Sequence, residues 1–100
     1  MTLNEFRKTT ADDQPPDGVS LALAGLWWDA KGDWTRAHES AQRDETTAGS
    51  WVHAYLHRKE GHASNAAYWY RRAGKTVSGL SLDQEWSQIA ESLLTASGGG

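Results

Sequence analysis

Histidine is the residue of this 100-residue chain with the widest chemical use, because an imidazole can bind a metal ion or exchange a proton near neutral pH. His53 and His57 lie four residues apart, so on a helix they share one side and can point at one metal ion. His38 and His62 could each add a third ligand. A small-molecule or metal site around His53 and His57 is therefore one hypothesis, with the imidazoles as acid and base if the site is enzymatic.

The competing hypothesis is that these histidines are structural. His38 and Glu39 resemble the start of the zincin motif, but Gln42 stands where that motif needs its second histidine. No carboxylate flanks His53 and His57 to complete a known metal motif, and no nucleophile elbow presents a serine. We therefore favour histidines that lie in a helix seam, hydrogen-bonded to neighbours, and predict no catalytic residue, no metal ligand set and no cofactor.

Helices are the elements that must position these residues. No segment alternates apolar and polar residues over the length of a strand, whereas apolar residues recur at helical spacing. The capping-box pattern occurs at Thr2 with Glu5 and at Ser81 with Gln84, which marks two helix starts. The sequence predicts an all-α fold with helices at residues 3–10, 21–31, 34–43, 49–60, 63–73 and 82–96.

Two short blocks of the sequence repeat each other. The segment 32–37 resembles the segment 61–66, which follows it by 29 residues. Gly32 and Gly61 are expected to end a helix with positive φ, a conformation that glycine adopts without a steric penalty. Ala37 and Ala66 are expected to be buried where two antiparallel helices cross, because a larger side chain would force the helices apart.

These blocks, with the helices around them, resemble the tetratricopeptide repeat. The matching residues are Leu21, Ala24, Gly25, Trp28, Gly32, Trp34, Ala37 and Ala41 in one unit and Ser50, His53, Ala54, His57, Gly61, Ala66, Tyr70 and Ala73 in the next. The stretch 67–74 also resembles the end of a Sel-type repeat, and the run 51–57 is similar to a run in small bacterial proteins that implies no particular function.

The resemblance implies tandem antiparallel helix hairpins in a right-handed stack, with units at about 20–44 and 49–74. Helices at about 3–10 and 82–96 would cap this stack in a single domain of residues 1–96, followed by a flexible tail at 97–100. It also implies a protein-interaction module that binds a peptide or helix on the helix predicted at 49–60.

The residues of that helix that would face a partner are Trp51, Tyr55, Arg58 and Lys59, which share one side at helical spacing. Aromatic area gives affinity in an interface, and arginine can clamp a carboxylate. The same pattern fits a face of internal packing, covered by the C-terminal helix. The sequence leaves both alternatives open.

Composition excludes several other classes of function. A formal net charge of −3 argues against non-specific nucleic-acid binding, and the absence of cysteine excludes disulfides and thiolate sites. No apolar run approaches the length of a membrane span, and the N-terminus lacks the apolar region of a secretory signal. We expect a cytoplasmic monomer or weak homodimer with neither nucleic acid nor membrane as a partner.

Overall fold

A computed structural model describes residues 1–97, which form six α-helices and no strand, so the all-α expectation is confirmed. The helices are α1 (Leu3–Thr9), α2 (Leu21–Ala30), α3 (Trp34–Arg43), α4 (Thr47–Lys59), α5 (Ala63–Ala73) and α6 (Leu82–Ser97). Within residues 1–97, none of these helices is long and apolar enough to cross a membrane.

Side-chain caps begin α1 and α6 where the sequence predicts them. The Thr2 hydroxyl accepts from the Glu5 amide at 3.1 Å, and the Glu5 carboxylate accepts from the Thr2 amide at 2.7 Å. Ser81 and Gln84 make the same pair of bonds before α6, at 3.1 and 3.2 Å. Each capping box satisfies amides that have no partner within the helix, so these ends are set by local chemistry.

The positive φ of the two turn glycines and the burial of the two alanines are also confirmed. Gly32 has φ of 83° and Gly61 has φ of 80°, at the ends of α2 and α4. Ala37 is 0% exposed and Ala66 is 2% exposed. Helices α2 and α3 pack closely on each other, as do α4 and α5.

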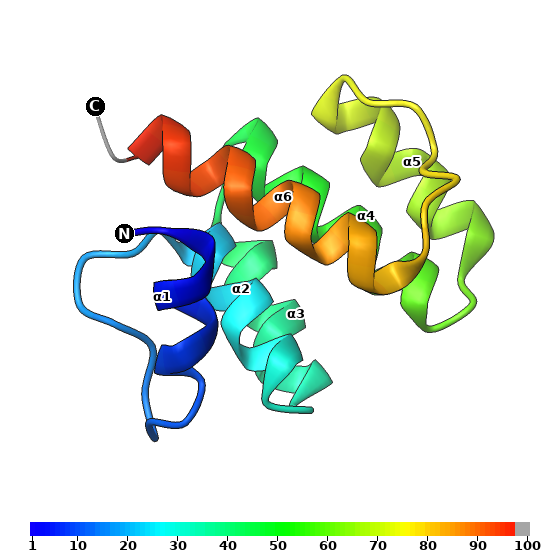
Figure 1. Ribbon diagram of the computed structural model, residues 1–100. Coiled ribbons are helices and arrows are strands. Elements are labelled where there is room, and N and C mark those ends of the chain that lie inside the picture. Colours follow the sequence, from blue (N-terminus) through cyan, green and yellow to red (C-terminus); the bar gives the residue numbers. More distant parts are fainter. Residues whose placement is uncertain (98–100) are drawn as a thin grey trace.

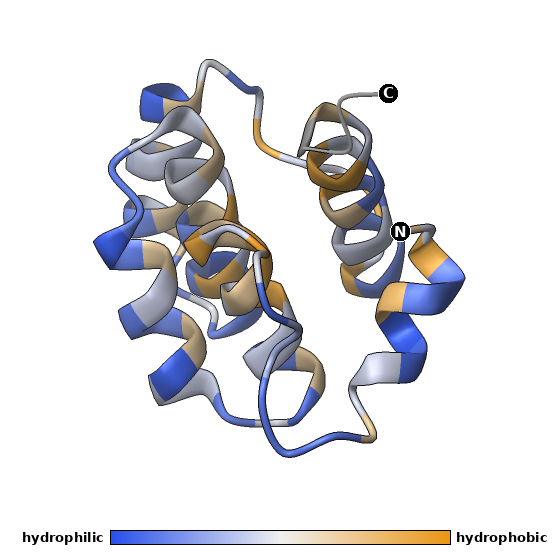
Figure 2. Cartoon of the chain, turned by 90° about the vertical axis from the view of Figure 1, so that its left-hand side faces the viewer, coloured by the Kyte–Doolittle hydropathy of each residue, from blue (hydrophilic) through white to orange (hydrophobic). Residues whose placement is uncertain are grey.

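The remaining helices cover this assembly. In Figure 1, α6 lies across α4, and it also contacts α2 and α1. Phe6 on α1 is fully buried and stacks on Trp86 of α6 with ring centroids 5.9 Å apart, so α1 docks on the body as expected. Figure 2 shows hydrophobic and hydrophilic positions alternating along the outer helices, while the loop between α1 and α2 is largely hydrophilic.

Several helix ends differ from the sequence predictions by one or two residues. Helix α4 begins at Thr47, two residues earlier than expected, because the Thr46 side chain accepts from the amide of Gly49. The buried face of α6 runs through Trp86 and Leu94, and Leu93 beside them is only half-buried. Helix α6 extends to Ser97, which the sequence prediction placed in the tail at 97–100, and the remaining residues of that tail lie outside the described residues.

Candidate functional site

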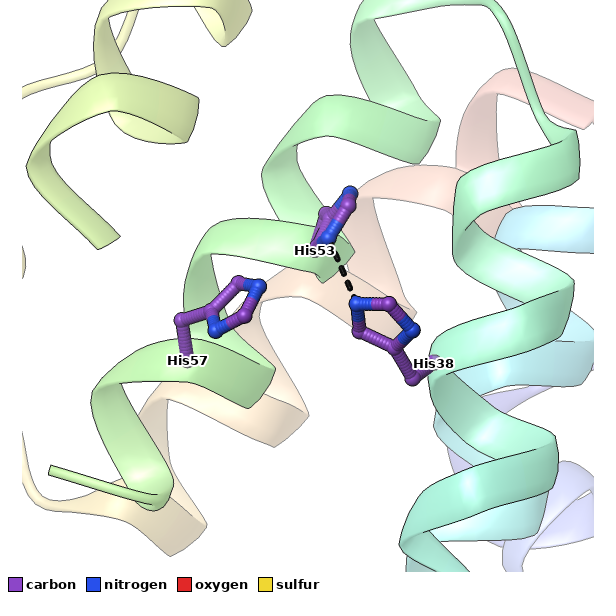
Figure 3. A group of neighbouring side chains, drawn as sticks. All are labelled: His38, His53 and His57. Atoms are coloured by element: carbon purple, nitrogen blue, oxygen red, sulfur yellow. Dashed lines mark hydrogen bonds between the residues drawn. The ribbon is translucent and has the colours of Figure 1, made fainter. Parts of the chain in front are cut away.

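Three histidines from two helices meet beside α4. His38 lies on α3, while His53 and His57 lie one turn apart on α4 and point toward His38 (Figure 3). One ring nitrogen from each lies within 4.8 Å of the other two, and the Nε2 atoms of His38 and His53 are 2.9 Å apart. The structure thus adds His38 to the pair singled out by spacing. The arrangement has features of both sequence hypotheses. The three rings lie in the seam between two helices, as structural histidines would, and their nitrogen atoms also point toward one another, as the ligands of a metal ion would.

Two tryptophans flank this group, which we call the histidine cluster (His38, His53 and His57). The Trp34 ring stacks on His38 with centroids 4.8 Å apart, and the Trp69 ring, from α5, stacks on His53 at 3.9 Å. Both tryptophans are half-buried, so one face of each ring shields an imidazole from water.

The fourth histidine of the chain touches the same cluster. His62 is exposed and precedes α5, and its Nδ1 lies 3.1 Å from Nδ1 of His57. In Figure 3 the opposite edge of the His57 ring points toward His53 and His38. His57 therefore stands between His62 and the two other members of the cluster.

Burial keeps the cluster uncharged at neutral pH. Burial, together with smaller contributions from the neighbouring imidazoles of His38 and His57, lowers the pKa of His53 to about 4. Burial also lowers the pKa of His38 and of His57. A neutral imidazole carries a free nitrogen lone pair, which is the form that binds a metal ion.

A pocket of about 320 Å³ reaches His53 from the surface between α3, α4 and α5. Trp69 and Arg72 line it from α5, and Gln42 lines it from α3. The guanidinium of Arg72 lies over the Trp69 ring, 5.2 Å from the centroid. A water molecule or small ligand can therefore approach the cluster from this side.

The face expected to bind a partner is largely covered by the chain itself. Trp51 is 8% exposed and Tyr55 is 2% exposed. The Lys75 ammonium lies over the Trp51 ring at 4.3 Å from the centroid, and α6 packs on α4. Of the two alternatives that the sequence left open, burial of these aromatics matches internal packing.

The two cations of that face are also engaged within the chain. Arg58 donates to the fully buried carboxylate of Glu85 on α6 at 2.8 Å, and to the Leu80 carbonyl. Lys59 donates to Asp29 on α2, also at 2.8 Å. These contacts tie the end of α4 to α6 and to α2.

A tyrosine completes each ion pair. Tyr55 donates its hydroxyl to Asp29 at 2.8 Å, and Tyr70 donates to Glu85. Burial raises the pKa of both tyrosines, so each hydroxyl remains a donor. Each buried carboxylate thus has a cation and a hydroxyl as partners, which offsets much of its desolvation cost.

Sequence reasoning did not anticipate Trp69 or Glu85. Nothing local indicates that the Trp69 ring would face His53, because that contact depends on how α5 crosses α4. A signal for Glu85 was present, since a carboxylate three residues after Leu82 and four before Ile89 lies on the apolar side of α6.

Comparison with protein families, with curated proteins and with solved structures finds no match to this chain.

Proposed function

We propose that this protein binds a divalent transition-metal ion through His38, His53 and His57. The observation that carries the proposal is the convergence of three imidazoles, two of them buried, with ligand atoms within 4.8 Å of one another. The sequence hypothesis named His38 and His62 as possible third ligands beside His53 and His57, and His38 is the one that groups with them.

The spacing of the nitrogen atoms is close to what a metal ion needs. Two ligands of a tetrahedral site lie about 3.3 Å apart when each metal–nitrogen bond is about 2.05 Å. The hydrogen bond between the Nε2 atoms of His38 and His53 needs a proton on one of them, and that proton must leave or move to Nδ1 before both can bind an ion. These two atoms, at 2.9 Å, must also separate slightly, and His57 must approach. These are side-chain rotations on two helices that already pack together.

The donor set selects the class of metal. Imidazole suits Zn²⁺, Cu²⁺ and Ni²⁺, whereas Mg²⁺ and Ca²⁺ take oxygen ligands. Three protein ligands leave a tetrahedral ion with one open position, which water or a small ligand would fill. The pocket beside His53 provides access for that molecule.

Isothermal titration with Zn²⁺ and Ni²⁺ tests the proposal. We expect stoichiometric binding by the wild type, lost in His53→Phe, His57→Phe and His38→Phe. Phenylalanine replaces the imidazole with a somewhat larger aromatic ring that can still stack in the seam but has no nitrogen to bind a metal ion, so circular dichroism should stay helical. Asp12→Asn combined with Asp13→Asn, on the exposed loop, is the matched control and should bind as the wild type does.

A thermal shift gives a second readout on the unmodified chain. A ligand at a hundredfold excess over its Kd stabilises by about 2.7 kcal/mol, which for a domain of about 100 residues raises Tm by roughly 10–20 °C. A chelator should reverse the rise. If neither metal moves Tm and titration gives no heat, the cluster is a packing seam and the proposal is wrong.

The interaction role implied by the tetratricopeptide resemblance is a second proposal. The pairs α2–α3 and α4–α5 would be its two units, supported by the glycine turns and alanine crossings that recur 29 residues apart. Because Trp51 and Tyr55 are buried, we place the partner on α5. Tyr68 is 46% exposed there, and Arg72 lies 5.7 Å from its ring centroid.

Tyrosine and arginine are enriched in interface hot spots, and the exposed Arg71 beside them favours a carboxylate-rich peptide. We expect a labelled acidic peptide to bind the wild type in fluorescence anisotropy. Tyr68→Ala or Arg72→Ala should each weaken binding about 30-fold, the equivalent of about 2 kcal/mol. Ser64→Ala, at the exposed start of α5, should change nothing. Equal affinity for all variants would exclude this surface.

A further inference from the structure

His62 occupies a helix position that histidine does not serve well. It is the N-cap residue of α5, yet its side chain makes no cap hydrogen bond. At the corresponding place before α3, Asp33 accepts from the Arg36 amide at 3.0 Å, as an N-cap residue normally does. The His62 ring instead turns to His57, with the two Nδ1 atoms 3.1 Å apart.

That contact has a consequence for the far side of the His57 ring. A hydrogen bond between two Nδ1 atoms needs a proton on one of them. If His57 is the donor, its Nε2 carries the lone pair, and this is the edge that points toward His53 and His38 (Figure 3). If His62 is the donor, the His57 proton sits on Nε2, among the other imidazoles, and blocks that nitrogen as a ligand.

We propose that His62 is a positioning residue for the metal site, which accepts the Nδ1 proton of His57 and so holds its Nε2 ready to bind the ion. Histidines that bind metal ions commonly donate their second ring N–H to a neighbouring acceptor, which fixes both the tautomer and the ring orientation. The inference rests on the proposed metal-binding function, but the tautomer of His57 can be observed without metal.

The decisive variant is His62→Ser. Serine is a good N-cap residue, so α5 keeps or improves its start and Tm should be unchanged or higher. The serine side chain is too short to replace the imidazole contact with His57. A purely structural His62 would therefore give a variant that differs from the wild type in stability alone.

Two measurements on this variant test the inference. Long-range proton–nitrogen NMR correlation of the metal-free protein near neutral pH should place the His57 proton on Nδ1 in the wild type and largely on Nε2 in His62→Ser. Titration with Co²⁺, followed by its visible absorption, should show affinity reduced 10- to 100-fold in the variant, as for other partners of metal-binding histidines. Asp33→Ala is the matched control, because it removes a cap without touching the cluster and should leave Co²⁺ affinity unchanged.

The outcomes separate the two proposals. If the wild type binds no Co²⁺, the proposed function fails and the positioning role fails with it. If the wild type binds Co²⁺ and His62→Ser binds it equally well, only the role of His62 is overturned. A His57 proton on Nε2 in the wild type would also overturn it.

Discussion

The guanidinium of Arg58, on α4, donates to the fully buried carboxylate of Glu85, on α6, at 2.8 Å. This bond crosses the side of α4 on which a partner was expected, and it helps to hold α6 against that side. The cation that a tetratricopeptide-like groove would offer to a ligand is bound instead by a carboxylate of the same chain.

Breaking this pair should be costly because the remaining carboxylate stays buried. We expect Arg58→Ala to lower the free energy of unfolding by about 3 kcal/mol or more. Urea unfolding followed by circular dichroism measures it. Arg71→Ala removes an exposed arginine from α5 and should change stability by no more than about 0.5 kcal/mol. If Arg58→Ala cost no more than this control, Glu85 would not depend on its partner, and α6 would be held by apolar packing alone.

The metal-free protein should lose stability as pH falls through the range where its histidines titrate. Burial lowers the folded pKa of His53 from 6.5 to about 4, with His38 and His57 shifted in the same direction. The unfolded chain therefore binds more protons in this window, so the contribution is fully present above pH 6.5 and declines toward pH 4. For His53 the loss is on the order of 3 kcal/mol.

Comparing the wild type with His53→Phe separates the contribution of His53 to the pH dependence of stability from that of the carboxylates, which also titrate in acid. Glu45 and Arg72, which line the pocket beside His53, remain in both proteins. Thermal unfolding in a pH series should show a shallower decline of Tm in the variant than in the wild type. Parallel curves for the two proteins would mean that His53 titrates in the folded state as it does in the unfolded chain.

Gly49 and Gly79 should respond oppositely to alanine. A Cβ on Gly49 would lie 2.0 Å from the Asp44 carbonyl oxygen, so the turn before α4 would have to move, at a cost of about 1–3 kcal/mol. A Cβ on Gly79 meets nothing within 4 Å. Because alanine restricts the backbone of the unfolded chain more than glycine does, Gly79→Ala should be neutral or slightly stabilising. Differential scanning calorimetry of the two variants checks this contrast, and a Gly49→Ala protein as stable as the wild type would contradict the described turn.

What the sequence determined by itself was local. The capping boxes at Thr2 and Ser81 and the turns at Gly32 and Gly61 depend on atoms within a few residues, so pattern and propensity were enough to place them. The i, i+4 spacing likewise placed His53 and His57 on one side of a helix.

Only the tertiary structure decided which surfaces meet. His38 reaches His53 through the packing of α3 on α4, Trp69 reaches it through the crossing of α5, and Glu85 reaches Arg58 from another helix 27 residues away in the chain. The composition of α4 suits an open groove and a buried seam equally well, because aromatic and cationic side chains occur in both. The choice depends on the α6 contacts, which join residues distant in sequence and follow from the packing of the whole core rather than from any short pattern.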